Sequence, residues 1–250
     1  MTDIVRHNQD QGACGDGATL NAFLRRAAIV DCKLVPWGSN YTFVVVMVDP
    51  AGDRPETICI YKPRAGETPL WDFPSGTLYQ REYASFLLAH RLGWDFIPHT
   101  IIRDGPHGIG TVQLYVEPDE QTRYFSVRET FADDLRRIAL FDLITNNADR
   151  KSGHFFRGKH DGRIWGIDHG LTFHVQPKLR TVIWDFRGET IAERFVDDLI
   201  RLYADDALKD VLRPHLDLLE IEALRGRVAR VAEDGVFPEL TSRRNIPYGW

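Results

Sequence analysis

The sequence predicts a two-lobed α+β protein in which an antiparallel sheet forms the first lobe and helices form most of the second. Runs of aromatic and β-branched residues, separated by turn residues, fill the first half of the chain. Apolar residues at helical spacing dominate the second half. A chain of 250 residues is long enough for two lobes around a cleft. We expect residues 1–118 to form the sheet lobe and residues 119–250 the helical lobe.

Composition narrows the possible partners and the compartment. With 31 basic and 36 acidic residues the net charge is −5, which argues against nucleic acid as a partner. No apolar run approaches the length of a membrane span, and the polar N-terminus is not a signal peptide, so we expect no intrinsic membrane anchor. Cys14, Cys32 and Cys59 are widely spaced, which is typical of a reducing cytoplasm. A cytoplasmic protein is expected, and its oligomeric state stays unknown.

The first lobe begins with a polar, Gly-rich segment, residues 1–17, that we expect to be frayed. A short helix over 19–28 follows, and then a three-stranded antiparallel meander over 29–35, 41–48 and 57–61. The turn between the first two strands contains Ser39 and Asn40, whose backbone N–H groups could cradle phosphates. Both are therefore candidate nucleotide-binding residues, although a plain hairpin turn is the simpler interpretation.

A lysine and a glutamate form the next candidate pair. A capping box at Thr77 and a stop signal at Gly93 predict a helix over residues 78–92. Glu82 falls on the apolar face of this helix, where a carboxylate needs a cationic partner. Lys62, at the end of the third strand, is the nearest candidate. Such a pair holds the ATP phosphates in protein-kinase-like folds; the alternative is a boundary glutamate that reaches solvent.

The chain then crosses into the second lobe. Two more strands are expected over 97–103 and 111–116, and a hinge over 117–120 in which Glu117 would contact the nucleotide. Thr130 is expected to cap a helix whose apolar residues repeat up to Ile144. Further helices are expected near 190–204 and 217–234.

Charged residues gather around a short apolar strand at residues 164–167. Carboxylates at the mouth of a buried strand are costly unless they meet a cation or a proton donor. Two of them with a histidine between suggest divalent-metal and phosphate chemistry. The charged residues are Asp149, Arg150, His154 and Asp168.

In this order along the chain, several segments resemble the type II phosphatidylinositol 4-kinases, within the phosphatidylinositol 3-/4-kinase-like superfamily. The loop from Asn146 to Arg150 resembles the Asn-Thr-Asp-Arg catalytic loop of that family, and Ile167 to Phe173 resembles its Ile-Asp-Asn-Gly-Leu-Ala-Phe metal loop. The resemblance runs from Tyr41 to Trp184 and suggests a bacterial branch of the superfamily. The other matching segments are Lys62-Pro63 with Glu67, Arg81-Glu82, and Ile97 to Thr100.

The resemblance implies a protein-kinase-like fold and an ATP-dependent phosphotransferase that acts on a hydroxyl group. It implies that Lys62 binds the α- and β-phosphates and that Glu82 orients it. It further implies that Asp149 lies beside the attacking hydroxyl and that Asp168 binds Mg²⁺. Arg150 would brace the loop or neutralise the transferred charge; the alternative is a surface arginine.

The chain departs from the family pattern at two histidines. His154 stands where these kinases keep a metal-binding asparagine, and a nitrogen ligand suits Mn²⁺ better than Mg²⁺. The alternative for His154 is an ordinary hydrogen-bonding residue. His169 replaces the asparagine beside the metal aspartate and is expected to be structural. The Cys-rich lipid-anchoring segment is absent, so we expect a soluble hydroxyl-bearing acceptor of unknown identity.

Three other functions stay open. A nucleotide-binding pseudokinase or regulatory module would account for His154 and for the short Gly turn. A nucleotidyl transferase could use the same fold. A metal-dependent hydrolase built on Asp149, His154 and Asp168 would leave Lys62 and Glu82 without a part.

Overall fold

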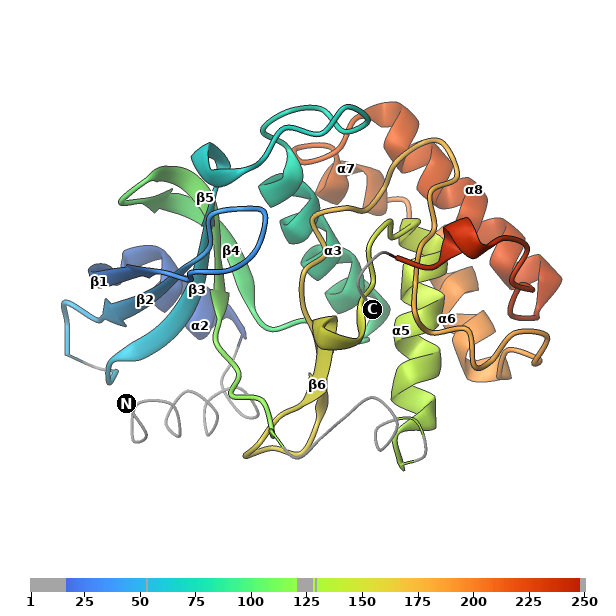
Figure 1. Ribbon diagram of the computed structural model, residues 1–250, viewed down its shortest axis with the longest axis horizontal. Coiled ribbons are helices and arrows are strands. Elements are labelled where there is room, and N and C mark those ends of the chain that lie inside the picture. Colours follow the sequence, from blue (N-terminus) through green and yellow to red (C-terminus); the bar gives the residue numbers. More distant parts are fainter. Residues whose placement is uncertain (1–16, 53, 121–127, 129, 248–250) are drawn as a thin grey trace.

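The computed structural model describes residues 17–52, 54–120, 128 and 130–247. The segment predicted to be frayed, apart from Gly17, lies outside the described residues, and so does Cys14. Figure 1 shows the sheet with α2 on one side, the helices α5, α6 and α8 on the other, and α3 between them. None of the helices in the described part of the chain is long and apolar enough to cross a membrane.

The sheet has five antiparallel strands in the order β1-β2-β3-β5-β4. Buried side chains alternate along β2, so that one face of the sheet packs on helix α2 (Gly17–Arg26) in a core of their own. The predicted meander is confirmed. The last two strands meet in a tighter hairpin than predicted, because pairing continues to Gly105 and Gly108. The strands are β1 (Ala28–Leu34), β2 (Phe43–Val48), β3 (Thr57–Pro63), β4 (Thr100–Gly105) and β5 (Gly108–Leu114).

Helix α3 (Leu78–Leu92) has the predicted bounds, but its N-terminus is capped differently. Thr77 does not cap the helix; its hydroxyl donates to the carbonyl oxygen of Pro74. The carboxylate of Glu67 accepts instead from the N–H groups of Leu78 (3.1 Å) and Tyr79 (2.8 Å). A carboxylate satisfies two helix N–H groups at once and also complements the positive end of the helix dipole. The predicted capping box is therefore wrong.

The second lobe is mostly helical. Helices α5, α6 and α8 confirm the predicted ones, whereas α7 and strand β6 were not predicted. Thr130 does not cap α5, which follows Phe131 without a side-chain cap. The helices are α5 (Ala132–Thr145), α6 (Glu193–Tyr203), α7 (Leu208–Leu212) and α8 (Leu218–Asp234), and a two-stranded hairpin joins β6 (Phe155–Arg157) to β7 (Ile164–Gly166).

Helix α3 belongs to the core of the second lobe although it also faces the sheet. Its buried residues Leu88 and Leu92 pack in the same cluster as those of α5, α6 and α8. The buried Arg81 donates to the carbonyl oxygen of Thr172 (2.7 Å) and forms an ion pair with Glu220 of α8. The helix is thus fixed to the second lobe, and the neighbouring residue Glu82 is presented to the sheet.

Candidate functional site

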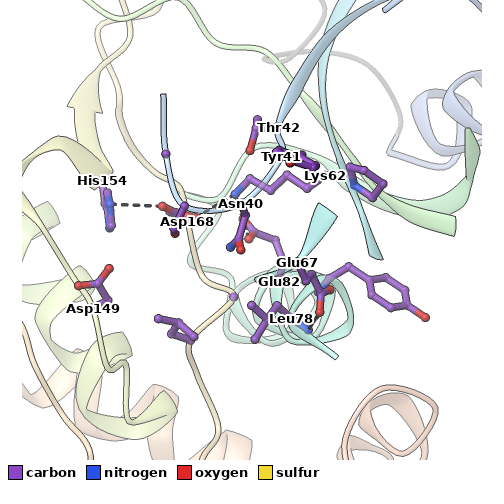
Figure 2. A pocket seen from close by; sticks show the side chains of 16 residues that line it. Asn40, Tyr41, Thr42, Lys62, Glu67, Leu78, Glu82, Asp149, His154 and Asp168 are labelled. Atoms are coloured by element: carbon purple, nitrogen blue, oxygen red, sulfur yellow. Dashed lines mark hydrogen bonds and ion pairs between the residues drawn. The ribbon is translucent and has the colours of Figure 1, made fainter. Parts of the chain in front are cut away.

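A pocket lies where the sheet, α3 and the loops around β7 meet (Figure 2). Its lining includes three of the four predicted catalytic and metal residues, Asp149, His154 and Asp168, together with Lys62 and Glu82. These residues come from five separate segments of the chain. The remaining lining residues are Gly38, Ser39, Asn40, Tyr41, Thr42, Pro63, Glu67, Leu78, Tyr79, Gly170 and Leu171.

Lys62, on the sheet, contacts a carboxylate of α3 and the carboxylate of Asp168. Its Nζ donates to Glu82 Oε2 at 3.0 Å and to Asp168 Oδ1 at 3.1 Å. The predicted pairing of Lys62 with Glu82 is therefore present in the structure. Burial alone would lower the pKa of Lys62, but the charges of Asp168 and Glu82 outweigh it and raise that pKa above its usual value. The lysine stays charged and can attract an anion into the pocket.

Asp168 follows β7 in a left-handed backbone conformation, with φ of 64°. Aspartate is one of the few side chains other than glycine that tolerate this region. Lys62, aided by His154, holds the pKa of Asp168 below its usual value although burial opposes the shift. The carboxylate is therefore ionised, and its side chain is 53% exposed, which leaves it accessible to a cation.

His154 closes the other side of Asp168. The N–H of Lys151 donates to His154 Nδ1 (3.3 Å), and His154 Nε2 lies 3.3 Å from Asp168 Oδ2. Because Nδ1 accepts a hydrogen bond, the proton of the neutral ring is assigned to Nε2. Burial keeps the pKa of His154 below its usual value, although Asp168 opposes the shift. In this arrangement both nitrogens are engaged, and the ring would have to turn to bind a metal; the metal-ligand role of His154 stays a prediction.

Asp149 reaches the pocket from the loop that follows α5. Its N–H donates to Asn147 Oδ1 (3.0 Å), which fixes the turn, and its carboxylate pairs with Lys151 Nζ at 2.9 Å. Figure 2 shows Asp149 on the same side of the pocket as His154 and across from Lys62. The carboxylate can thus face a group that approaches the pocket from outside.

Arg150 is completely buried behind the loops. Its guanidinium pairs with the buried Asp142 of α5 (3.0 Å) and donates to the carbonyl oxygens of His154 (3.2 Å) and Ile167 (2.9 Å). These bonds tie together the loops that carry Asp149, His154 and Asp168. Of the roles predicted for Arg150, the structure agrees with bracing of the loop; a surface arginine is wrong, and the buried guanidinium does not line the pocket, as a direct catalytic role would require.

Ser39 and Asn40 line the pocket from the loop between β1 and β2. Asn40 Oδ1 accepts from the N–H of Thr68 (2.8 Å), and the N–H of Tyr41 donates to Gly66 O (2.9 Å). A Cβ atom on Gly66 would lie 2.8 Å from the Cβ of Tyr41, so only glycine allows this approach. Hydrogen bonds to the segment that follows β3 thus hold this loop beside the pocket.

Glu117, like Arg150, is a predicted site residue that does not line the pocket. Its carboxylate forms ion pairs with Lys159 and with His160 Nε2 (3.0 Å), and its carbonyl oxygen accepts from the N–H of Lys159 (2.9 Å). The side chain thus links the end of the sheet lobe to the turn between β6 and β7. Its predicted contact with a nucleotide has no support from this position.

Sequence reasoning did not include Glu67 among the site residues. Burial raises the pKa of Glu67 above its usual value, although the N–H groups of Tyr79 and Leu78 oppose the shift. The signal was available: an acidic residue shortly before a helix start can cap it when the intervening chain folds back.

The donor set of the pocket suits a hard divalent cation with phosphate oxygens. Asp168 is ionised and accessible, and Glu82 Oε1 is buried without a hydrogen-bond partner. Within the described ranges no three His, Cys, Asp or Glu side chains lie close enough to hold an ion alone. Mg²⁺ is commonly bound in this way, through one or two carboxylates and the substrate's phosphates.

Comparisons with solved structures define the fold. The Golgi casein kinase has a TM-score of 0.55 and 16% identity, and the match covers 87% of this chain and 73% of that chain. The same kinase with Mn/ADP bound gives a TM-score of 0.54 and 16% identity, covering 87% of this chain and 74% of that chain. Hydra Fam20 with sugar gives 0.57 and 13% identity, over 92% of this chain and 94% of that chain. The fold is therefore the predicted two-lobed, protein-kinase-like one.

Sequence comparison supplies the family. No protein-family model matches the chain. A curated relative, "Protein Rv2133c" of Mycobacterium tuberculosis (strain ATCC 25618 / H37Rv), is 40% identical, and the match covers 76% of this chain and 81% of that protein. This identity and coverage are high enough to establish common membership. The chain belongs to the family of Protein Rv2133c and has the fold of protein kinases.

Proposed function

We propose that this chain is an ATP-dependent phosphotransferase of the phosphatidylinositol 3-/4-kinase-like type, which transfers the γ-phosphate to a hydroxyl acceptor. The observation that carries the proposal is the double contact of Lys62 with Glu82 and Asp168. In kinases the strand lysine must pair with the helix glutamate, and the metal-binding aspartate must lie beside them. Here both conditions are met within one pocket.

Six of the residues that line the pocket have a part in this reaction. Lys62 binds the α- and β-phosphates, Glu82 orients its ammonium group, and the N–H groups near Ser39 and Asn40 cover the phosphates. Asp168 would hold Mg²⁺ or Mn²⁺, which neutralises phosphate charge when bound. Asp149 orients the acceptor hydroxyl and takes its proton. The acceptor oxygen bonds to the γ-phosphorus while the bond to the β–γ bridging oxygen breaks, and ADP leaves.

The solved structures are consistent with this proposal. The Golgi casein kinase has been solved with Mn/ADP bound, and its fold is the one seen here. The sequence resemblance to type II phosphatidylinositol 4-kinases places the same roles on Lys62, Asp149 and Asp168. We place the protein in the cytoplasm and its acceptor among soluble compounds; the two described cysteines, Cys32 and Cys59, are free thiols, as a reducing compartment favours.

Two alternatives differ from this proposal in chemistry. A pseudokinase would bind nucleotide without turnover, and the engaged nitrogens of His154 favour it because one expected metal ligand is lost. A metal-dependent hydrolase is disfavoured because Lys62 neutralises Asp168 directly. Nucleotidyl transfer would need the α-phosphorus rather than the γ-phosphorus to face Asp149.

Nucleotide binding is tested by thermal unfolding. ATP with Mg²⁺ at about 100 times its Kd should stabilise the native state by about 2.7 kcal/mol, which raises Tm by roughly 5 to 10 °C. Lys62→Ala should remove most of this shift because the phosphates lose their cation. Lys33→Ala is the matched control, since Lys33 is exposed on β1 and pairs only locally with Asp31. A wild-type protein that shows no shift with any nucleoside triphosphate contradicts the proposal.

Turnover separates the kinase from the pseudokinase in the same series. The slow transfer of the γ-phosphate to water can be followed without a known acceptor. Asp149→Asn should abolish it while the ATP-induced Tm shift persists, because Asp149 acts on the attacking oxygen. Asp168→Asn should weaken the shift itself. A wild-type protein that binds ATP and never releases phosphate, alone or with cell extract, is a pseudokinase.

A further inference from the structure

The segment that follows the Asp168 loop lies directly beside the Asp149 loop. Arg150 pairs with Thr181 in a parallel bridge: the N–H of Arg150 donates to Arg180 O (3.0 Å), and the N–H of Val182 donates to Arg150 O (3.1 Å). In a parallel bridge the preceding residues are also neighbours, so Arg180 lies next to Asp149. Two residues of opposite charge thus stand side by side at the edge of the pocket.

Their side chains share one face. Arg150 and Thr181 both turn inward, because the guanidinium and the Thr181 hydroxyl (3.1 Å) both bond to the buried Asp142. Successive side chains in extended chain point to opposite faces, so Asp149 and Arg180 are directed outward. Asp149 lines the pocket, whereas Arg180 does not. Arg180 is therefore next to Asp149 in the bridge but outside the residues that line the pocket.

The cations around Asp149 differ in whether their charge is neutralised. Lys151 pairs with Asp149 itself, and Lys178 pairs with Asp72 at 2.7 Å. In the portion of the chain that the structure describes, the guanidinium of Arg180 has no hydrogen bond and no ion pair. Arg180 as a residue is partly buried, and a guanidinium that is withdrawn from water without an acid beside it is costly unless an anion reaches it.

The C-terminal turn adds two more cations at this edge. Asn245 donates to Leu179 O (3.0 Å) and accepts at its own carbonyl from the N–H of Thr181 (3.0 Å). Arg243 and Arg244, in the same short turn, are exposed, and no acid among the described residues pairs with either side chain. The turn that carries Arg243 and Arg244 is thus bonded to both neighbours of Arg180, in a chain whose net charge is −5.

The pocket interior has the opposite charge. Four carboxylates line it, those of Glu67, Glu82, Asp149 and Asp168, against one lysine and a neutral histidine. In the proposed reaction Lys62 is occupied by the ATP phosphates, so a negative group on the acceptor needs a cation outside the pocket, where the arginines attract it. The guanidinium fork of arginine matches phosphate and carboxylate groups with two hydrogen bonds.

We propose that Arg180, with Arg243 and Arg244, binds an anionic group on the acceptor, so that the substrate is a hydroxyl compound that also carries a phosphate or a carboxylate. The proposal rests on the proposed phosphotransferase function and names its substrate class. The arginines hold the anionic group outside the pocket and direct the hydroxyl toward Asp149. Arg180 thus acts on the acceptor, whereas the buried Arg150 braces the loops.

The first test measures anion binding without turnover. Inorganic phosphate is titrated at constant ionic strength while the Nε–Hε signals of the arginines are followed by NMR, with chloride as the reference anion. A saturable shift of the Arg180 signal is expected. Arg180→Gln should weaken phosphate binding at least five-fold, and Arg243→Gln with Arg244→Gln should weaken it further. Arg201→Gln is the control, because Arg201 is 67% exposed on α6 and pairs with Asp198.

An unsaturable response, or equal affinity in Arg180→Gln and Arg201→Gln, overturns the proposal. The ATP-induced Tm shift is measured on the same variants and should be unchanged in Arg180→Gln. A persisting ATP shift with no phosphate binding rejects the acceptor site alone, whereas loss of the ATP shift in the wild-type protein rejects the phosphotransferase.

The second test compares acceptors in matched pairs. ADP formation with glycerol 3-phosphate and glycerate should exceed that with glycerol at least ten-fold, and Arg180→Gln should raise KM for the anionic acceptors with little change in kcat. Phosphatidylinositol vesicles form a separate arm, in which phosphorylated lipid would identify a headgroup as the source of the anion. Equal rates for charged and neutral acceptors, or a loss confined to kcat, contradict the proposal.

Discussion

A single contact, that between His154 Nε2 and Asp168 Oδ2, decides how the aspartate is held. The backbone N–H of Lys151 occupies Nδ1 and leaves the ring proton on Nε2, which faces the carboxylate. Lys62 approaches the other oxygen of the same carboxylate at 3.1 Å. Asp168 is thus held between two proton-bearing groups, and a cation that binds it must share or replace one of them.

The role of His154 can be tested by exchanging its ring. His154→Gln keeps an N–H donor near the position of Nε2, whereas His154→Ala removes it. If the histidine orients Asp168, the alanine variant should bind ATP with Mg²⁺ and with Mn²⁺ more weakly by about the same factor, and glutamine should restore part of the affinity. The Tm shift with each ion measures this, and the ring ¹⁵N signals should show the proton on Nε2.

The metal-ligand role predicted from the sequence gives a different result. Mn²⁺ would then raise activity over Mg²⁺, His154→Asn would restore a preference for Mg²⁺, and the alanine variant would lose affinity for Mn²⁺ selectively. A selective loss of this kind would show that the ring turns toward a bound ion.

Sequence reasoning succeeded where one local pattern determined the partner. Glu82 lies on an apolar helical face, so a cation had to meet it, and Lys62 does at 3.0 Å. Arg150 could not be placed in the same way. Its burial depends on Asp142 in the preceding helix and on two carbonyl groups of later loops, which assemble only in the folded chain.

At the level of elements, the attachment of α3 to the second lobe is the main structural finding. Arg81 is 2% exposed and bonds to Thr172 O beyond the Asp168 loop and to Glu220 at the start of α8. The neighbouring residue on the same helix, Glu82, contacts Lys62 of the sheet. A displacement of α3 therefore moves the lysine–glutamate pair and the Asp168 loop together.

Removing one partner of the buried pair should be costly. Arg81→Met leaves the Glu220 carboxylate buried without its cation, and a loss of about 3–5 kcal/mol in the free energy of unfolding is expected. Arg81→Met with Glu220→Met should recover much of this loss because no unpaired charge remains. Urea denaturation measures both, and the ATP-induced Tm shift should fall in the single variant.

An exposed pair on the same helix provides the control. Arg91 and Asp205 also join α3 to the second lobe, with side chains 37% and 20% exposed. Arg91→Met should cost only about 0–1 kcal/mol, as surface ion pairs do. Similar losses at Arg81 and Arg91 would show that the buried pair has no special part in holding α3.

The sequence predicted the existence of most elements but not how they are joined. The bounds of α3 were predictable from cap and stop signals and the helical spacing of apolar residues, and the strands from runs of β-branched residues, because these signals are local in the sequence. The cap of α3 comes from Glu67, which reaches the helix only when the intervening chain folds back. The short strand β6 has too few residues for a pattern to appear.

At the scale of the molecule, the two cores explain why the fold class was predictable. The sheet and α2 enclose one apolar cluster, and α3 packs with α5, α6 and α8 in another. The first cluster corresponds to alternating apolar residues in the strands, and the second to apolar residues at helical spacing. The boundary between residues 118 and 119 stays a prediction, because α3 precedes it in sequence and yet belongs to the second core.

The pocket itself depends on loops from both lobes, and no sequence pattern predicts that these loops meet.

One buried histidine, His169, and two partly buried ones, His99 and His215, contribute to the response of the molecule to acid. Burial lowers the pKa of His99 to about 4, with a smaller contribution from the charge of His90, and burial also lowers the pKa values of His169 and His215. His99 Nε2 and both ring nitrogens of His169 are buried without a hydrogen-bond partner. In the unfolded chain these rings take up protons near pH 6.5.

The sign of the effect follows from proton binding. Between about pH 6.5 and pH 4 the unfolded state binds more protons than the native state, so the free energy of unfolding must fall as the pH falls. Each ring that stays neutral in the native state should cost about 2 kcal/mol at pH 5. Glu67 opposes this trend, because its pKa is raised by burial and the native state gains its proton first.

The free energy of unfolding should therefore decrease steeply from pH 7 to pH 5. His99→Phe should reduce this pH dependence by about the contribution of one histidine ring. His99 lies outside the pocket and packs edge-on against Phe86, so an apolar ring can fill its place. Urea midpoints at pH 7, 6 and 5 measure the slope. If His99→Phe keeps the full slope, the loss in acid has another source, and His169→Phe then tests the ring buried between Phe96 and Phe141.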